Sequence, residues 1–539
     1  MGFHLVYAGG WASKNSTNLF YTKKVNQVKL SLVEFFFNLI VTKSLNGYTF
    51  YAHNLGRFCS IFIIKSLVSN NKFHVEPIWK DNRIISLTLK LNKIKITILD
   101  SLQLIPGSLD DILNSFNCKI KKGKFPYEFV NKDNLKYIGD KPFKNFYNGI
   151  SELEYLDIPQ HNWDLKKQTL IYLRADVEGL LEALEKFNTT VYSKYKLNIT
   201  SFKTLSSLAL AIYRSSYLPD NILPDFKMIK GELEREIRTS YFGGNVDVFY
   251  NKISNGYLYD MNSQYSTAML QDMPVGDPVL SLENNLDNIF GFVYGEITCP
   301  DESYLQVPFI QYKDPFYKMN SCPRGKFKRF IFSEEIKYAL KYGYTINIEY
   351  CYQFKRGKNI FKDYIEDLYE IKKTSIDPVQ KSLAKLLLNS LYGRLGMKDI
   401  ESTLKIVDKS EVEALDKNTN VSILSELTNN KYLIQYQGQI SDSIRKLYKK
   451  DPLVASDFKT INYSKTHLRQ SGLNKKINVP SAVHIAAAIS SYARFTINEY
   501  KNIPGNPCVM SDTDSVVLTK PLPEHLVGGE LGQMKLEQE

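Results

Sequence analysis

The sequence predicts a multi-domain α/β (α+β) protein. At 539 residues, with 43% hydrophobic side chains, the chain is long enough to form several packed cores. Within residues 1 to about 200, short β-branched or aromatic runs alternate with helical stretches, since Leu87 to Ile98 is strand-like and Leu170 to Phe187 is helix-like. Further along, residues 507–518 are typical of a β-hairpin, and residues 380–393 and 479–500 are typical of helices.

The expected hairpin carries two aspartates at its tip. In Pro507-Cys-Val-Met-Ser-Asp-Thr-Asp-Ser-Val-Val-Leu518, an apolar run breaks at Asp512 and Asp514 and resumes as a β-branched run. Residues two apart on an extended chain point to the same side, so we expect both carboxylates to face one spot. Because like charges tolerate such closeness when a cation lies between them, the segment predicts a divalent-metal site. The alternative is an ordinary turn with solvated carboxylates.

Two other segments carry side chains suited to the same site. Asp260 ends a short apolar strand within residues 257–269, and a helix-prone stretch follows it. Residues 380–393 place leucines at helical spacing between Leu383 and Leu391, which predicts one apolar stripe. Off that stripe, at steps of four, four and three residues, one polar face carries Lys381, Lys385, Asn389 and Tyr392.

These three segments, in this order, resemble motifs A, B and C of the family B DNA polymerases. The matching residues are Asp260-x-x-Ser-x-Tyr265, Lys385-x-x-x-Asn389-Ser-Leu-Tyr-Gly393 and Asp512-Thr-Asp-Ser515. Tyr241-Phe-Gly-Gly244 precedes motif A as the Tyr-x-Gly-Gly element does in the protein-primed branch, which includes phage, linear-plasmid and mitochondrial-plasmid enzymes. Two long spacers between the motifs also resemble that branch.

The resemblance implies a fold and a domain order. We expect an RNase H-like, degenerate 3′–5′ exonuclease-type domain over residues 1–200, followed by a right-hand polymerase palm and fingers over residues 201–539. Insertions like the terminal-protein regions are expected at about 276–375 and 397–478. The thumb is expected to be missing, and the chain is expected to be truncated at both ends.

The resemblance also implies roles for individual residues. Asp260, Asp512 and Asp514 would hold two Mg²⁺ ions, with Mn²⁺ as an alternative, for nucleotidyl transfer. Lys385 would act with them in catalysis by meeting the triphosphate, and Tyr265 would exclude ribonucleotides. The other nucleotide-binding residues would be Lys381, Asn389 and Tyr392. DNA would contact Tyr241, Gly243, Gly244, Ser101, Leu102, Gly393 and Arg494.

The first 200 residues keep only parts of the exonuclease motifs. The segment from Tyr51 to Cys59 resembles the second motif, with Asn54 and Phe58 in place but Cys59 where an aspartate belongs. Tyr172 to Asp176 resembles the third motif, and no Asp-x-Glu lies between Met1 and Phe50. A lone carboxylate cannot hold two hard cations, so proofreading is expected to be absent.

Composition narrows the class of partner. The formal net charge of +12 favours a polyanion such as nucleic acid. The six cysteines form no Cys-x-x-Cys pair, and no run reaches the ~20 apolar residues of a membrane span. From these observations, together with the family resemblance, which implies template and primer DNA, dNTPs and a terminal protein as primer, we expect a monomer without membrane attachment.

The expected location is the mitochondrion. The N-terminus lacks an import signal, and the many Lys, Asn, Ile, Tyr and Phe residues suggest an AT-rich gene read inside that organelle. Two rival functions remain: a catalytically inactive truncated remnant that only binds DNA, and an RNA-templated polymerase. The second is disfavoured because those enzymes carry Tyr-x-Asp-Asp where this chain has Asp512-Thr-Asp-Ser515.

Overall fold

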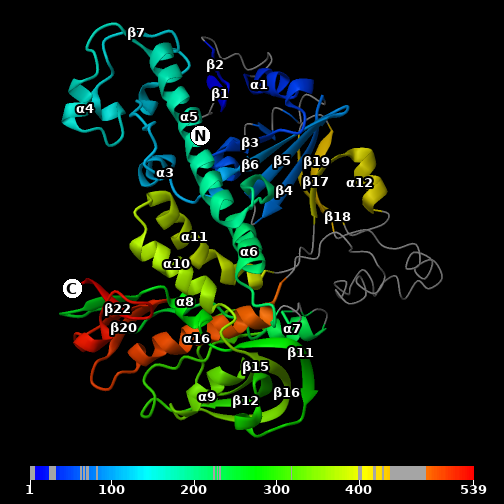
Figure 1. Cartoon of the computed structure of the whole chain (residues 1–539), viewed down its shortest axis with the longest axis vertical. Coiled ribbons are helices and arrows are strands. Elements are labelled where there is room, and N and C mark those ends of the chain that lie inside the picture. Colours follow the sequence, from blue (N-terminus) through cyan, green and yellow to red (C-terminus); the bar gives the residue numbers. More distant parts are fainter. Residues whose placement is uncertain are drawn as a thin grey trace. The chain divides into compact units, whose positions relative to one another are not determined.

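In the computed structural model the chain forms two compact units. Figure 1 shows their helices and strands, coloured along the sequence. Unit 1 comprises Met1–Leu208, Ser375–Leu383 and Glu401–Asn462, and unit 2 comprises Ala209–Thr374, Ala384–Ile400 and Tyr463–Glu539. The structure describes residues 6–22, 32–60, 63–64, 67, 72–80, 83–222, 225–226, 229, 232–316, 319–397, 403–416, 421–427, 430–436 and 481–539.

Unit 1 is built on a four-stranded sheet of order β3-β6-β5-β4, in which β3 and β6 are parallel and the other neighbours antiparallel. The expected single strand over residues 87–98 is wrong, because Asn92 adopts a left-handed φ of 53° and the chain reverses there. One face of the sheet buries an apolar core with helix α1. The elements are β3 (Thr49–Ala52), β4 (His74–Lys80), β5 (Arg83–Leu91), β6 (Ile94–Asp100) and α1 (Leu32–Ile40).

The longest helix of unit 1, α5 (Leu165–Tyr195), extends the predicted helix over residues 170–187 at both ends. It begins where the Asp164 carboxylate accepts the backbone N–H of Lys167, which satisfies one free donor of the first turn. It packs against the hairpin of β1 and β2 and against α3. The remaining elements are β1 (Ala8–Ser13), β2 (Ser16–Tyr21), α3 (Leu109–Ser115), β7 (Ile138–Gly139), α4 (Glu152–Leu156) and β8 (Trp163–Asp164).

Within the expected 397–478 insertion, the described residues from 403 to 436 group with unit 1. They form a three-stranded antiparallel sheet of order β17-β19-β18 with one helix, and β17 lies beside β4. The rest of that insertion, including residues 437–478, lies outside the described residues. The elements are β17 (Thr403–Asp408), α12 (Lys409–Asp416), β18 (Val421–Glu426) and β19 (Lys431–Tyr436).

Unit 2 contains two antiparallel sheets. The first has the order β22-β10-β21-β20-β9, and the second has the order β11-β16-β12-β15. The strands of the first are β9 (Val246–Val248), β10 (Tyr257–Met261), β20 (Cys508–Asp512), β21 (Ser515–Leu518) and β22 (Met534–Gln538). The second sheet is formed by β11 (Met273–Ser281), β12 (Gly291–Cys299), β15 (Gly325–Phe332) and β16 (Thr345–Gly357), and a small hairpin by β13 (Tyr312–Lys313) and β14 (Asn320–Ser321).

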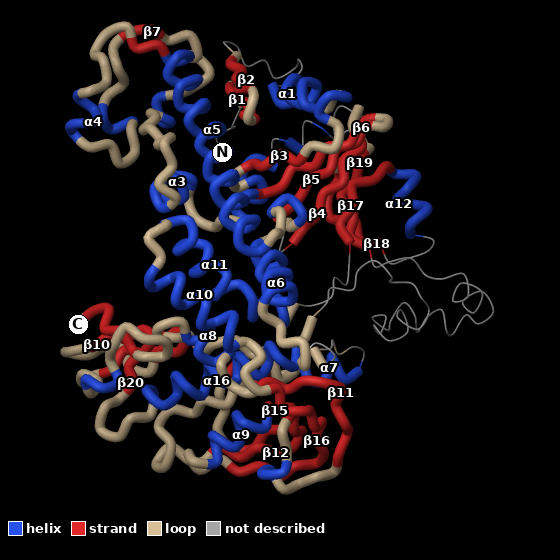
Figure 2. Tube along the Cα trace, in the orientation of Figure 1, coloured by secondary structure: helices blue, strands red, loops and turns tan. Residues whose placement is uncertain are grey.

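A buried helix, α16 (Val483–Lys501), contacts both sheets of unit 2 and lies between them in Figure 2. It confirms the helix predicted over residues 479–500, whose first two residues lie outside the described part. The other helices of unit 2 are α7 (Glu232–Arg238), α8 (Gln264–Met269), α9 (Ser333–Leu340) and α10 (Lys362–Thr374). Two helices belong partly to each unit, α6 (Leu205–Ser216) and α11 (Pro378–Leu395). Every helix in the described part is too short or too polar to span a bilayer.

Candidate active site

Strand pairing brings the three candidate aspartates of unit 2 to one place. Ser515 on β21 pairs with Asp260 of β10 on one side and with Asp512 of β20 on the other. The backbone N–H of Met261 donates to the carbonyl of Asp514 at 2.8 Å, which joins the end of β10 to the turn of the hairpin. The acidic hairpin and the strand-end position of Asp260 are therefore as the sequence predicts.

The reason given for placing Asp512 and Asp514 together is wrong. The two residues do not lie on one extended strand, because β20 ends at Asp512 and the chain turns at Thr513, where φ is 53°. Asp512 is exposed and accepts a hydrogen bond from the Thr513 hydroxyl at 3.1 Å. Asp514 lies in the turn and is half-buried. The two carboxylates are thus near each other through a tight reversal rather than through strand periodicity.

The electrostatics of Asp260 and Asp514 show that this spot is short of positive charge. Burial raises the pKa of Asp260, and the nearby carboxylates of Asp514 and Glu537 raise it further. Burial also raises the pKa of Asp514, with a contribution from Asp512. Lys535, which pairs with Asp260 across β10 and β22, acts in the opposite direction on Asp260. A cation bound here would relieve the repulsion.

The acidic spot fits a divalent cation that also takes ligands from elsewhere. Among the described residues, no three His, Cys, Asp or Glu side chains form a ready-made metal cage. Mg²⁺ is commonly held by only one or two carboxylates together with water and substrate phosphates, so the pair Asp260 and Asp514 is sufficient. Asp512 and Glu537 add negative charge nearby. Sequence reasoning missed Glu537, which only strand pairing through β22 brings to the site.

Tyr265 stacks face to face on Tyr392, with ring centroids 3.9 Å apart and an interplanar angle of 6°. This contact joins the first turn of α8 to the exposed face of α11. The buried Gln264 amide donates to the carbonyls of Ala493 and Thr513, at 3.0 and 3.2 Å. Gln264 therefore holds α8 against α16 and against the acidic turn, a role that the sequence alone did not indicate.

Helix α11 has the two faces that the sequence predicts. Its apolar side is buried, with Leu383, Leu387 and Leu391 each at most 3% exposed. Lys381, Lys385, Asn389 and Gly393 are exposed and Tyr392 is half-buried. The polar face is therefore free to meet a ligand.

A second lysine of unit 2 accompanies Lys385. Lys372, on α10, donates to the Ser263 hydroxyl at 3.2 Å. Burial and the positive charge of Lys385 lower the pKa of Lys372. Two ammonium groups that repel each other in this way would be stabilised by an anion between them. Sequence reasoning missed Lys372, and the only available signal was the basic pair Lys372-Lys373, which the structure places at the end of α10.

The segment Tyr241–Gly244 connects α7 to β9 and lies against the acidic turn. A Cβ added at Gly244 would come within 2.8 Å of the Thr513 Cα, so a glycine is required there for packing. Tyr241 is half-buried against Gly396, whereas Gly243 is exposed and would accept a Cβ without contact. Of this segment, Gly243 therefore offers the backbone most open to a ligand.

Arg494 does not lie at a surface, and its assignment to DNA contact is wrong. The side chain is 5% exposed, and its guanidinium makes a two-point ion pair with Glu335, at 2.9 and 2.7 Å. A phosphate cannot reach a charge that is buried and already paired. Sequence composition could not distinguish this arginine from a surface one, because its partner lies on α9.

In unit 1, the expected exonuclease remnant contains one carboxylate with a lysine beside it. The Lys122 ammonium lies 3.3 Å from Asp176, while burial raises the pKa of Asp176. Tyr172 is half-buried among aromatic rings. Asn54 adopts a left-handed φ of 63°. For Phe58 and Cys59 the side chains lie outside the described part, and their backbone forms one helical turn.

The hydroxyl of Ser101 is not available to a DNA strand. Ser101 is fully buried and its hydroxyl lies 3.1 Å from His53 Nδ1, which corrects its assignment to direct DNA contact. Leu102 is half-buried, and its N–H donates to the Asp100 carboxylate. The other Asp100 oxygen accepts the N–H of Gly56 at 3.0 Å, so this acid serves the local backbone.

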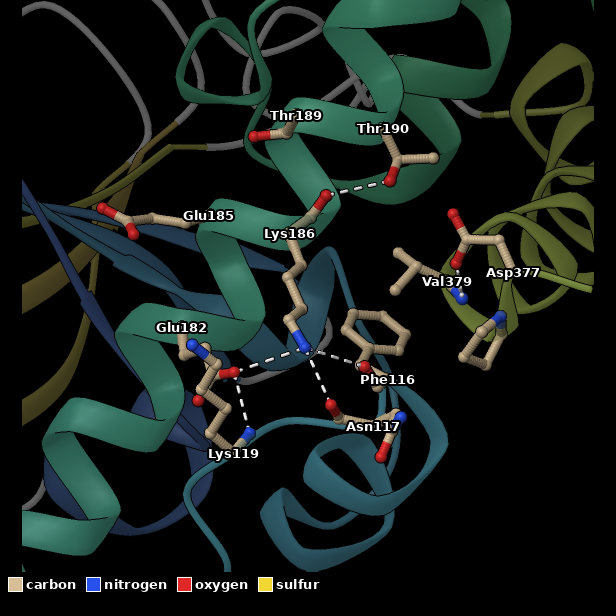
Figure 3. Close-up of a pocket in the computed structure, with 11 residues that line it drawn as sticks. Phe116, Asn117, Lys119, Glu182, Glu185, Lys186, Thr189, Thr190, Asp377 and Val379 are labelled. Atoms are coloured by element: carbon tan, nitrogen blue, oxygen red, sulfur yellow. Dashed lines mark hydrogen bonds and ion pairs between the residues drawn. The ribbon is translucent and has the colours of Figure 1, made fainter.

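A hollow of about 610 Å³ in unit 1 lies among α3, α5 and the start of α11 (Figure 3). Lys186 reaches across it to the carbonyls of Phe116 and Asn117, at 3.2 and 2.8 Å, and to Glu182 at 3.3 Å. Glu182 in turn accepts the backbone N–H of Lys119. These bonds hold the end of α3 against α5. Because Lys186 and Glu182 are already paired, their charges are not free to bind a ligand.

Comparison with known proteins identifies relatives over almost the whole chain. The family model described as DNA polymerase type B, organellar and viral, matches residues 43–479. A protein of Agaricus bitorquis named "Probable DNA polymerase" is 40% identical, over 99% of this chain and 68% of its own length. One with the same name from Podospora anserina is 31% identical, over 99% of this chain and 48% of its own length.

Solved structures show the same fold. The chain superimposes on phi29 DNA polymerase complexed with primer-template DNA and incoming nucleotide substrates with a TM-score of 0.68 at 21% identity, over 99% of this chain and 82% of that one. This match confirms the expected exonuclease-type domain followed by palm and fingers. At this level of identity it shows the fold alone.

Proposed function

Since this chain belongs to the organellar and viral type B DNA polymerases, we propose that it adds deoxynucleotides to the 3′ hydroxyl of a primer as a DNA template directs. The observation that carries the proposal is that Asp260, near the end of β10, meets Asp514 in the turn between β20 and β21, at a spot where Asp514 raises the pKa of Asp260 and Asp512 raises the pKa of Asp514. In the same unit, the face of α11 supplies Lys385 and Tyr392.

Asp260 and Asp514 would hold the metal ions, with Asp512 and Glu537 as supporting negative charge. Divalent cations bound there would supply charge stabilisation to the attacking and leaving oxygens of the displacement. The carboxylates would hold these ions in place, because strand pairing fixes the backbones of Asp260 and Asp512 and the hydrogen bond from Met261 fixes the turn at Asp514. The residues fit a divalent cation because Asp260 and Asp514 repel each other when both are ionised and no cation lies between them.

The lysines would bind the triphosphate. Lys385 and Lys372 repel each other in the free protein, and the negative charge of a bound triphosphate relieves that repulsion. Lys381 lies one turn before Lys385 on α11 and is exposed on the same helix. Each ammonium acts as a point charge, so these contacts favour charge on the leaving pyrophosphate without demanding one geometry.

The stacked tyrosines would form the pocket for the new base pair. Tyr265 would lie under the deoxyribose and leave no room for a 2′ hydroxyl, and Tyr392 supports its ring at 3.9 Å. Asn389 and the exposed backbone at Gly393 would face the incoming nucleotide and the template from α11. Gly243 and Gly244 would contact the template next to the acidic turn.

Primer extension tests the proposal and separates it from the inactive-remnant alternative. The whole chain is incubated with a labelled primer on a DNA template, all four dNTPs and Mg²⁺ or Mn²⁺. Extension by the wild type, lost in the Asp514→Asn variant, is the expected result. Binding of primer–template without extension under any metal would identify a non-catalytic remnant. An RNA template in a parallel reaction tests the third function.

We also propose that replication is protein-primed, acts on a mitochondrial plasmid or genome, and uses a terminal protein as the partner. The Tyr-x-Gly-Gly element and the amino-acid composition support this proposal. Transfer of a labelled nucleotide to a protein, in a form that survives boiling in detergent, is the expected result in mitochondrial extract of the source organism. Label found only in DNA would contradict protein priming.

Proofreading is proposed to be absent, because Cys59 stands where the second exonuclease motif has an aspartate and because Asp176, the acid that matches the third motif, is paired with Lys122. The test is a single-stranded oligonucleotide labelled at its 3′ end, incubated with Mg²⁺ and no dNTPs. Metal-dependent release of nucleotides that persists in an Asp514→Asn variant would refute this proposal.

A further inference from the structure

The segment Tyr241–Gly244, here called the Tyr241 loop, is held by buried side chains from distant parts of unit 2. The carbonyl of Phe242 accepts a hydrogen bond from Arg494 Nη1 at 2.7 Å. The next carbonyl, that of Gly243, accepts one from Gln311 Nε2 at 3.1 Å. Arg494 is 5% exposed and Gln311 is 4% exposed, so both donors approach the loop from the protein interior.

Arg494 is itself fixed before it reaches the loop. Its Nε and Nη2 atoms bond the two oxygens of Glu335, and Nη2 also donates to the Ser491 hydroxyl at 2.9 Å. Ser491 donates to the same Glu335 carboxylate at 2.8 Å. The guanidinium is planar and rigid, so this arrangement fixes the direction in which Nη1 points. Nη1 is therefore preorganised to meet the Phe242 carbonyl.

The Tyr241 loop is also anchored by the side chain of Phe242 and by the backbone of Asn245, which follows its last residue. The Phe242 ring lies under the guanidinium of Arg329, 4.5 Å from the ring centroid. The N–H of Thr513 donates to the Asn245 carbonyl at 2.9 Å, which ties the end of the loop to the acidic turn. A displacement of the Tyr241 loop would therefore disturb both the ion pair and the turn that carries Asp514.

The direction of two carbonyls determines the direction of two amides. A trans peptide group is planar, with its C=O and N–H pointing in opposite directions. No cis peptide occurs among the described residues. Because the Phe242 carbonyl points inward to Arg494, the N–H of Gly243 points outward, at a residue that is exposed. By the same reasoning, Gln311 turns the N–H of Gly244 away from itself, and that amide lies near the Tyr265 hydroxyl.

We propose that Arg494, held by Glu335, and Gln311 are positioning residues for template binding: they fix the two central peptide groups of the Tyr241 loop so that the Gly243 amide faces the DNA backbone. The inference rests on the proposed function, in which this loop meets the template. An outward carbonyl at the same place would repel a phosphate, whereas an outward amide can donate to it. Neither positioning residue touches DNA.

Binding of a fluorescent primer–template over a range of salt concentrations tests this inference in the full chain. Gln311→Met removes the donor and keeps the volume of the side chain. Arg494→Met removes both the donor and the charge. Loss of one such hydrogen bond should weaken binding about fivefold in each variant. The slope of log K against log salt should stay at the wild-type value, whereas loss of a direct phosphate contact would lower it by about 1.

A matched control removes a buried hydrogen bond elsewhere in unit 2. The Tyr213 hydroxyl donates to the Ile360 carbonyl at 2.9 Å, so Tyr213→Phe loses one buried bond to a backbone carbonyl without touching the loop. This variant should keep wild-type affinity. If Arg494→Met does not fold, Gln311→Met decides alone, because it leaves the ion pair intact.

Amide hydrogen exchange of the peptide covering residues 239–246, in the DNA-free protein, supplies a readout that does not depend on the proposed function. Exchange should be faster in both Met variants and unchanged in Tyr213→Phe. Wild-type affinity or wild-type exchange in Gln311→Met would overturn the inference, as would a salt slope lowered by about 1 in Arg494→Met. Failure of the wild type to bind or extend a primer would instead count against the proposed function, and exchange would still decide the inference.

Discussion

Gly393→Ala should have opposite effects on the stability of the free protein and on its affinity for DNA. Gly393 lies within α11, it does not have a positive φ, and a Cβ built on it meets nothing within 4 Å. An alanine is therefore accommodated in the free protein without strain. Because glycine is poorer than alanine inside a helix, the substitution should raise the free energy of unfolding by ~0.5–1 kcal/mol.

The same methyl should weaken DNA binding, because the proposed template path runs close to this bare backbone. Forcing a methyl into a well-packed contact costs ~1–3 kcal/mol, which corresponds to at least about a fivefold rise in Kd. Denaturant unfolding measures the first effect, and titration of a labelled primer–template measures the second. Gly9→Ala is the control, since a Cβ there also meets nothing within 4 Å, and it should leave DNA affinity unchanged.

A stabilised Gly393→Ala variant with wild-type affinity would refute the close approach of DNA to α11. A destabilised variant would instead refute the interpretation that α11 has room for a methyl group at residue 393. The two measurements are independent, so one cannot compensate for the other.

Three further predictions follow from the same structure. His484 is fully buried without a hydrogen-bond partner among the described residues, and burial lowers its pKa to about 3. The unfolded chain takes up a proton at this residue near pH ~6.5 and the folded state does not, so the free energy of unfolding falls as the pH drops below ~6.5. The loss is about 1.4 kcal/mol at pH 5.5, and His484→Leu should lack this contribution when the free energies of unfolding at pH 7.5 and 5.5 are compared. Tyr265→Val should raise the incorporation of ribonucleotides relative to deoxynucleotides on the order of tenfold or more, and an unchanged ratio in a primer-extension assay would remove its proposed role. Asp514→Asn should stabilise the metal-free protein at pH 7, because the raised pKa of Asp514 means that its ionised carboxylate is unfavourable in the folded state. The same substitution should lower the extension rate by on the order of 10³-fold or more, because it removes a metal ligand. A variant that melts at a lower temperature than the wild type would contradict the inferred repulsion between the carboxylates.

Elements marked by local pattern were predictable from the sequence. The helix α11 follows from leucines at helical spacing, and the acidic hairpin follows from an apolar run broken by Asp512-Thr-Asp514. The division of residues 83–100 into β5 and β6 was not recognised, because the reversal depends on one asparagine, Asn92, in a left-handed conformation. Its polar neighbour Lys93 fits a strand edge as well as a turn, so the pattern alone could not decide.

The placement of site residues was predicted correctly from the sequence where their side chains are exposed, and wrongly where they are buried. Lys385 and Asn389 are exposed as the helical face requires. Arg494 and Ser101 were assigned to DNA by residue type, yet each is buried against a partner that no local pattern reveals, Glu335 and His53. A charged or hydroxyl side chain has the same sequence signature whether its partner is a ligand or another part of the chain.

The partner of Arg494 also bears on how residues 276–375 contribute to the site. Glu335, Gln311 and Arg329 all come from this stretch, which was expected to be an insertion. In the structure its strands β12, β15 and β16 and helix α9 form a core of their own, and α16 packs against them. Because Glu335 fixes Arg494 and Gln311 holds the next peptide group, this stretch determines the conformation of the Tyr241 loop. Shortening it should therefore impair template binding even where no deleted residue touches DNA.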